Sequence, residues 1–159
     1  MADFTGTLLS TGFRAKDNSA FLTDPEAQRA MDHIVKGEGG FFDCHDGWWA
    51  FGWYGQYPGS VLQLTCQTCD GEGATCSECD GEGNVEVDLT DIVQRHIHDD
   101  DICAIAVSGN EKLRYNGGTT AYVSTKGTVY VDGGAEWGTH LTRADLKGIA
   151  EKMKKLEDL

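Results

Sequence analysis

Apolar residues recur with a helical period in three parts of the chain. In residues 24–36 they follow the 3, 4, 7 and 8 spacing of one buried helix face, and Thr23 and Glu26 form a capping box at its start. The same spacing predicts helices over residues 90–98 and 143–156. The apolar stripe of the last helix consists of Leu146, Ile149, Ala150, Met153 and Leu156.

Between these helices the pattern is typical of β-strands. Alternation through Trp49, Phe51 and Trp53 predicts a strand with one apolar face. Shorter strands are expected at residues 4–10, 21–22, 61–64 and 85–87.

From residue 102 onward the composition changes to runs of β-branched and aromatic residues. These runs are separated by turn-rich links at residues 108–110, 116–118 and 125–127, which favours an antiparallel meander. The predicted strands of the meander are residues 102–107, 112–115, 119–124 and 128–132. The expected fold class is therefore α+β: an antiparallel β meander with two or three helices and an inserted, compact zinc finger of four cysteines.

The inserted finger is indicated by an internal repeat. The sequence C-x-x-C-D-G-E-G occurs twice with a ten-residue offset and contains four of the six cysteines: Cys66, Cys69, Cys76 and Cys79. Two C-x-x-C pairs supply four thiolates for a tetrahedral Zn²⁺ and leave no position open for water. We therefore expect one structural zinc ion at these four residues.

Two other uses of the cysteines are open at this stage. An iron–sulfur centre takes the same ligands. A disulfide framework suits a secreted chain, but the first residues lack the basic and apolar layout of a signal peptide. No apolar run approaches the roughly 20 residues that cross a bilayer. We expect a soluble, cytoplasmic protein that does not engage a membrane.

The C-x-x-C-x-G-x-G repeat resembles the cysteine-rich zinc-binding region of DnaJ-type co-chaperones and of small proteins that share it, such as anti-TRAP. The resemblance covers residues 66–83 and, for anti-TRAP, extends to residue 97 at most. It implies zinc ligation by the four cysteines and contact with protein rather than nucleic acid. This chain has two repeats where the DnaJ-type region has four, and it lacks the His-Pro-Asp triplet of a J-domain. Co-chaperone activity is therefore not transferred.

The net charge of −13 is concentrated in the middle of the chain. Residues 37–94 contain eleven carboxylates and no Lys or Arg. Such an excess argues against nucleic-acid binding, which depends on cations that neutralise phosphates. It indicates either a solvated, self-repelling surface or a surface for a basic partner. The candidate partner-binding carboxylates in the finger are Asp70, Glu72, Glu78, Asp80 and Glu82.

Two further clusters have both a functional and a purely structural interpretation. His96, His98 and Cys103 form a second candidate metal site, and the alternative is a helix end followed by an acidic turn. Cys44 and His45 are adjacent, so on a strand they point to opposite faces and do not form a nucleophile and its base. Cys44 and Cys103 are expected to be small buried residues.

The tryptophan-rich segment around Trp48 and Trp53 is expected to supply core residues, with an exposed partner-binding patch as the alternative. The predicted organisation is an N-terminal α+β part (residues 1–65), the finger (66–83), and a C-terminal part of helix, meander and helix (84–159). The first and third parts are expected to form one globular unit.

Together these features favour a non-enzymatic, zinc-stabilised acidic module that binds a protein with a basic surface or an apolar groove. An inhibitor, adaptor or assembly factor, encoded by a phage or a bacterium, has this character, and a homo-oligomer is compatible with the sequence. One alternative is a structural subunit of a larger viral assembly. Another is a small-molecule-binding protein or enzyme with its site in the meander.

Overall fold

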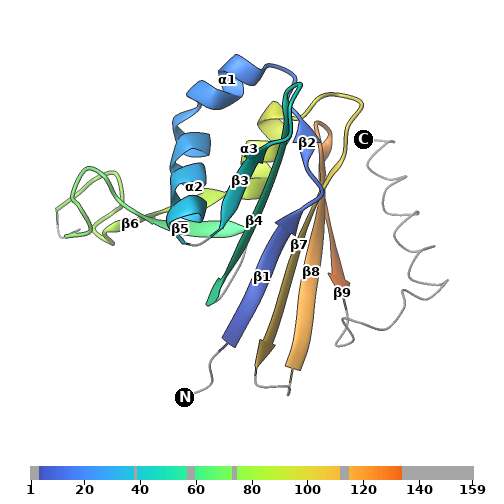
Figure 1. Ribbon diagram of the computed structural model, residues 1–159. Helices are drawn as coiled ribbons and strands as arrows, with labels where there is room; N and C mark the ends of the chain where they lie inside the picture. Colours follow the sequence, from blue (N-terminus) through green and yellow to red (C-terminus); the bar gives the residue numbers. More distant parts are fainter. Residues whose placement is uncertain (1–3, 38, 57–59, 73–74, 112–114, 134–159) are drawn as a thin grey trace.

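The computed structural model describes residues 4–37, 39–56, 60–72, 75–111 and 115–133 (Figure 1). It confirms the α+β class with mostly antiparallel strands. The strands are β1 (Phe4–Ser10), β2 (Phe13–Arg14), β3 (Gly40–Asp43), β4 (Trp48–Gln56), β5 (Val61–Thr65), β6 (Asn84–Asp88), β7 (Cys103–Glu111), β8 (Tyr115–Ser124) and β9 (Gly127–Gly133). The helices are α1 (Asn18–Thr23), α2 (Pro25–Lys36) and α3 (Leu89–His96). The predicted helix over residues 143–156 lies outside the described residues.

The strands form one large antiparallel sheet and one separate hairpin. The large sheet has the order β2-β4-β1-β7-β8-β9, with β3 also paired to β4, and the hairpin consists of β5 and β6. The helices lie against one face of the large sheet, where α2 packs beside β3 and α3 packs against β8 and β9 (Figure 1). The β5–β6 hairpin runs past the end of α2 and carries the cysteine segment away from this body (Figure 1).

The core lies between the helices and the helix-facing side of the sheet. Every second residue of the strands points into it, as Leu8, Phe51 and Ile105 do, each at most 2% exposed. Phe21 is fully buried at its centre, with ring centroids 5.5 Å from Phe13 and 5.2 Å from Trp49. The hairpin contributes Leu62, Leu64 and Val87 to the same cluster. The hairpin is therefore anchored in the body by its apolar side chains.

The strand predicted at residues 21–22 is wrong, because these residues belong to α1. Asp17 caps this helix by accepting a hydrogen bond from the N–H of Ala20 (3.0 Å). The predicted capping box of α2 is also wrong. Asp24 is the N-cap, and its Oδ1 accepts from the N–H groups of Glu26 (2.9 Å) and Ala27 (3.4 Å).

The predicted links at residues 108–110 and 116–118 are strand residues instead. Gly109 faces Gly117, and Ser108 faces Gly118, so β7 and β8 form one long hairpin. Glycine has little intrinsic preference for a strand because it has no side chain to pack, so the pairing of the two strands rather than local propensity accounts for these positions. The predicted link at residues 125–127 is confirmed as the connection from β8 to β9.

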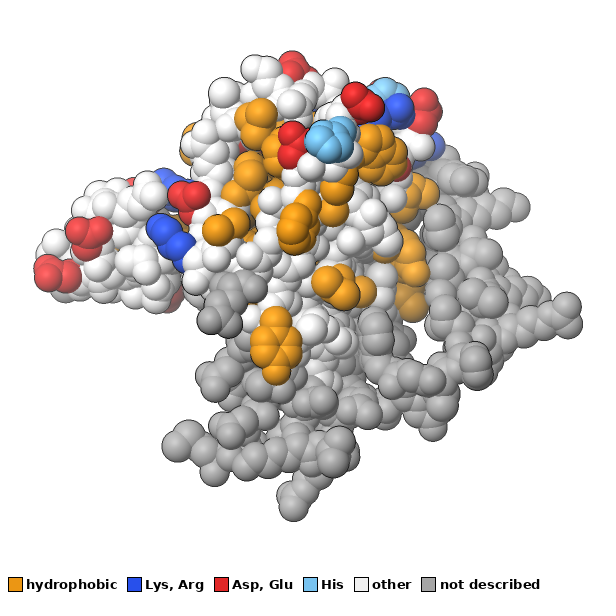
Figure 2. All heavy atoms as spheres, viewed as in Figure 1, with side chains coloured by type: hydrophobic (Ala, Val, Ile, Leu, Met, Phe, Trp, Pro, Cys, Tyr) orange, Lys and Arg blue, Asp and Glu red, His pale blue; other side chains and the backbone are white. Residues whose placement is uncertain are grey.

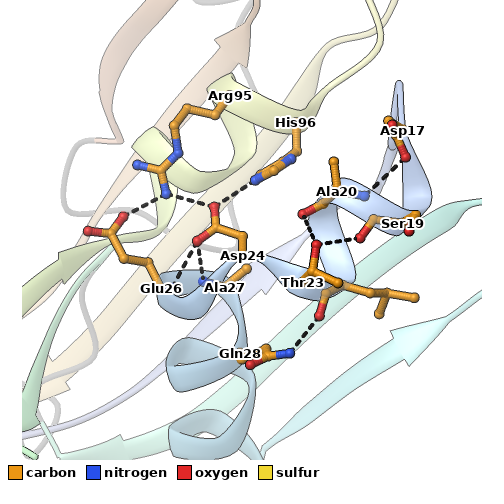
Figure 3. Close-up of polar contacts among 11 residues, drawn as sticks. Asp17, Ser19, Ala20, Thr23, Asp24, Glu26, Ala27, Gln28, Arg95 and His96 are labelled. Atoms are coloured by element: carbon orange, nitrogen blue, oxygen red, sulfur yellow. Dashed lines mark hydrogen bonds and ion pairs between the residues drawn. The ribbon is translucent and has the colours of Figure 1, made fainter.

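Asp24 also connects α2 to α3 (Figure 3). Its Oδ2 accepts hydrogen bonds from Nε2 of His96 (2.7 Å) and Nη2 of Arg95 (3.0 Å), and Arg95 forms a second ion pair with Glu26 (2.6 Å). Burial alone would raise the pKa of Asp24, but the hydrogen bonds from His96, the Glu26 N–H and Arg95 outweigh it and lower the pKa to about 2. The ionised carboxylate is therefore the form that holds the two helices together.

Replacing Asp24 by Asn is expected to lower the free energy of unfolding by about 2 kcal/mol at neutral pH. The pKa of Asp24 lies below the ordinary value of 3.8. Its contribution is therefore present above that value and is lost as the pH falls towards about 2. Denaturant unfolding of both proteins at a series of pH values should show the difference shrinking over this range. Asp32→Asn, at an exposed position of the same helix, is the control. A difference that does not change with pH would contradict the assignment.

Candidate metal centre

The cysteine repeat closes the hairpin of β5 and β6. The strands pair as far as Thr65 and Asn84, and the N–H of Cys66 then donates to the carbonyl of Gly83 (2.9 Å). Residues 66–83, called the finger from here on, therefore begin and end at the same point of the ladder. In Figure 1 the finger projects from the body at the end of this two-stranded ribbon.

The four repeat cysteines form one cluster. Their Sγ atoms all lie within 4.8 Å of one another, and the Cys66–Cys76 and Cys69–Cys79 pairs are both 3.7 Å apart. Four sulfurs placed tetrahedrally at about 2.3 Å from one ion are separated by about 3.8 Å. A disulfide requires about 2.05 Å, and all four residues are free thiols. The distances therefore fit ligation of a single metal ion.

The surroundings of the sulfurs favour a bound cation. Cys66 and Cys79 are buried, and Cys69 and Cys76 are half-buried. Burial raises the pKa of the Cys79 thiol to about 11, and the neighbouring cysteines add to the increase, while the N–H of Gly83 lowers it. A metal ion supplies the positive charge that allows four adjacent thiolates to coexist. Since all four positions are protein ligands, such a site is closed to water and structural in type.

The two repeats adopt the same turn. Asp70 and Gly71 have φ values of 49° and 86°, and Asp80 and Gly81 have 50° and 83°. These left-handed residues turn the chain so that the N–H groups of Glu72 and Glu82 each donate to the carbonyl of the preceding cysteine, at 2.9 Å. In the second repeat the N–H of Gly83 also donates to Sγ of Cys79 (3.2 Å). The Asp-Gly steps are thus the local reason for the two turns that bring the cysteines together.

The five finger carboxylates that the sequence indicates are all exposed. Figure 2 shows acidic side chains on the visible side of the finger. Glu78 has partners: Nη2 of Arg29 on α2 lies 3.6 Å from it, and the Thr68 hydroxyl donates to it. Within the described ranges, no other finger carboxylate forms an ion pair. The Arg29 contact could not be read from the sequence, because the helix that carries it is brought to the finger by the fold.

The second candidate metal site is not assembled. His96 bonds Asp24, His98 accepts at Nδ1 from Nη2 of Arg14 (3.0 Å), and Cys103 is buried in the core. The four repeat cysteines are the one group of potential ligands that converges among the described residues. Burial raises the pKa of the Cys103 thiol to about 12. The prediction that Cys103 is a small buried residue is therefore confirmed.

The prediction that Cys44 is buried is wrong. It is exposed in the turn between β3 and β4, where His45 and Asp46 have φ values of 73° and 55°. Of the tryptophans named as partner-binding candidates, Trp48 is 40% exposed, whereas Trp53 is half-buried and donates Nε1–H to the carbonyl of Gly37 (2.9 Å).

Gly83→Ala is expected to disrupt the finger much more than Gly47→Ala. Both glycines have a φ of 77°, but a Cβ at Gly47 meets nothing within 4 Å, whereas a Cβ at Gly83 lies 2.4 Å from the carbonyl oxygen of Gly71. Backbone strain alone costs about 1–2 kcal/mol, and overpacking adds about 1–3 kcal/mol at Gly83.

The two variants are compared by denaturant unfolding and by chelator competition for the bound metal. Only Gly83→Ala should release metal at lower chelator concentration. Equal effects of the two substitutions would show that the approach of the two turns does not support the centre.

Comparison of the chain with protein-family models, with curated proteins and with solved structures finds no significant match. None of the helices in the described ranges is long and apolar enough to span a lipid bilayer. The assignment of a metal centre rests on the four converging sulfurs and on the repeated turns that hold them.

Proposed function

We propose that the finger binds one structural zinc ion and presents an acidic surface to a basic protein partner. The observation that carries this proposal is the cluster of four thiols on a projecting hairpin tip that bears five exposed carboxylates. In this view the protein is a non-enzymatic binding module, such as an inhibitor, adaptor or assembly factor.

Zinc is the ion that the ligand set favours. Thiolates are soft ligands, and a tetrahedral set of four is typical of structural zinc. The sulfur separations of 3.7 Å fit one central ion, whereas a cluster of several irons holds its cysteine sulfurs farther apart. Metal analysis distinguishes zinc from a single iron ion.

The metal stabilises the folded finger. Among the described residues of the finger, the buried side chains are those of Cys66 and Cys79, so apolar packing contributes little to this segment. Metal binding and local folding are then one free energy. The ion fixes the directions in which the carboxylates of the two repeats point.

The charge of the finger supports a basic partner. Residues 66–83 contain five carboxylates and no Lys or Arg, and four thiolates with Zn²⁺ add a formal charge of −2. Such a surface accelerates encounter with a basic protein and repels nucleic acid. Trp48 is the better tryptophan candidate for an apolar contact, because Trp53 packs against the body.

The purified full chain is expected to contain one zinc per molecule by mass spectrometry of metals. Cys69→Ser should lose most of this zinc and should speed amide hydrogen exchange in the finger, because the ligand loss unfolds the segment. Cys44→Ser, which removes an exposed thiol from another turn, is the control and should retain the metal. Full zinc content in Cys69→Ser would contradict four-cysteine ligation.

Neutralising the exposed finger carboxylates should weaken partner capture. The variant Asp70→Asn, Glu72→Gln, Asp80→Asn and Glu82→Gln keeps residue shapes, and Asn tolerates the left-handed backbone at the two aspartates. The control neutralises four exposed aspartates elsewhere: Asp32, Asp46, Asp99 and Asp100. Quantitative affinity purification should show at least a tenfold loss of a basic partner in the finger variant alone.

The same purification at low and moderate salt tests the electrostatic origin of the binding. A partner that is lost at moderate ionic strength supports the acidic surface. A partner that both variants retain at high salt would contradict the proposal and would indicate an apolar interface elsewhere on the molecule.

A further inference from the structure

One face of the large sheet points away from the helices. The strand register places Leu9 opposite Ala106 and Gly52, on the reverse side from the buried Leu8. Thr7 and Ser108 lie on this side too, with their hydroxyl oxygens 2.7 Å apart. We call this side the outer face.

The outer face is mostly apolar, and its described positions on β1, β7, β8 and β9 carry no charged side chain. On β7, β8 and β9 its apolar side chains are Ala104, Ala106, Tyr122, Val129 and Val131, all half-buried, and on β1 it presents Leu9, which is 59% exposed. The polar side chains among them, which include Ser108 and Thr120, carry hydroxyls and no charge. Across the described side chains of these strands, none of the outer-face positions is Asp, Glu, Lys or Arg. Figure 2 shows apolar side chains along the sheet, with charged groups gathered at its upper rim and on the finger. A solvated sheet face normally carries polar and charged residues, so a face with no described charge and a majority of apolar side chains has the composition of a covered one.

The sequence that follows β9 has the length and the pattern to cover it. The described chain leaves the sheet at its β9 edge, and residues 134–159 follow. Residues 134–142 reach up to about 30 Å when extended, and a helix over residues 143–156 is about 21 Å long. Neighbouring strands are about 4.8 Å apart, so such a helix spans β9, β8, β7 and β1.

We propose that residues 143–156 dock on the outer face through Leu146, Ile149 and Met153. The predicted helix has one apolar stripe and one polar face that is rich in lysine. The sheet offers the small side chains of Ala104 and Ala106 between the larger Leu9 and Tyr122, which allows the apolar stripe to approach the strands closely. Docking buries the stripe and leaves the lysines in water.

A segment of the same chain is favoured over a second copy by its effective concentration. A short covalent tether holds a segment at millimolar effective concentration near its site. A second molecule reaches that level only at millimolar protein. The proposal is independent of the function assigned to the finger, since it concerns another surface of the body.

Photo-crosslinking of the full, metal-loaded chain tests the docking. Tyr122 is replaced by p-benzoylphenylalanine, which keeps an aromatic ring on the outer face, and a second probe replaces the more exposed Leu9. Irradiation should link both probes to residues 143–156 of the same chain, as identified by peptide mass spectrometry. The same probe at Val35, exposed on α2, should give no link to this segment.

Mixing with isotopically heavy chains separates the outcomes. Links between light and heavy chains would overturn the proposal in favour of a second copy. Links that avoid residues 143–156, or no links at all, would overturn it as well. Ile149→Asp should reduce the yield of the intramolecular link at least fivefold, whereas Lys155→Asp, on the opposite side of the predicted helix, should leave it unchanged.

Discussion

The convergence of four thiols at the tip of one hairpin is the constraint on which the finger depends. Their sulfurs lie within 4.8 Å of one another, and burial raises the pKa of Cys79 to about 11, so a cation is needed to hold them as thiolates. Ligation of an ion would close the loop between Thr65 and Asn84 and so support the register of β5 and β6. Because Leu62 and Leu64 of this hairpin are core residues, the metal centre is coupled to the body through the strands that carry it.

The body is stabilised by apolar burial and ion pairs rather than by metal ligation. Its sheet and helices bury apolar side chains around Phe21. The ionised carboxylate of Asp24 joins the start of α2 to the end of α3 by accepting hydrogen bonds from His96 and Arg95. The finger has little apolar core and a large negative charge, and Arg29 contributes one cation from the body to Glu78. This division lets a small protein carry a strongly acidic surface without placing its charges against its own core.

The sequence predicted the cluster of four cysteines and most of the elements, because cysteine spacing and apolar periodicity are local signals. The sequence-based predictions were wrong where a contact between residues distant in the sequence determines the local structure. Residues 21–22 are apolar and were predicted as a strand. They belong instead to a short helix capped by Asp17, which places the Phe21 ring in the core. Gly109 and Gly117 read as turn residues, yet they pair across a long hairpin. Cys44 was expected in the core, but two left-handed residues beside it form an exposed turn. Arg29 and Asp24 gain their roles only through distant partners.

The central claim is that one zinc ion, held by four cysteine sulfurs, organises the finger. Zinc K-edge X-ray absorption of the purified full chain tests it most directly, because the first coordination shell reports ligand type, number and distance together. The account predicts four sulfur atoms at about 2.3 Å and no lighter ligand. A shell that contains nitrogen or oxygen, or fewer than four sulfurs, would contradict it.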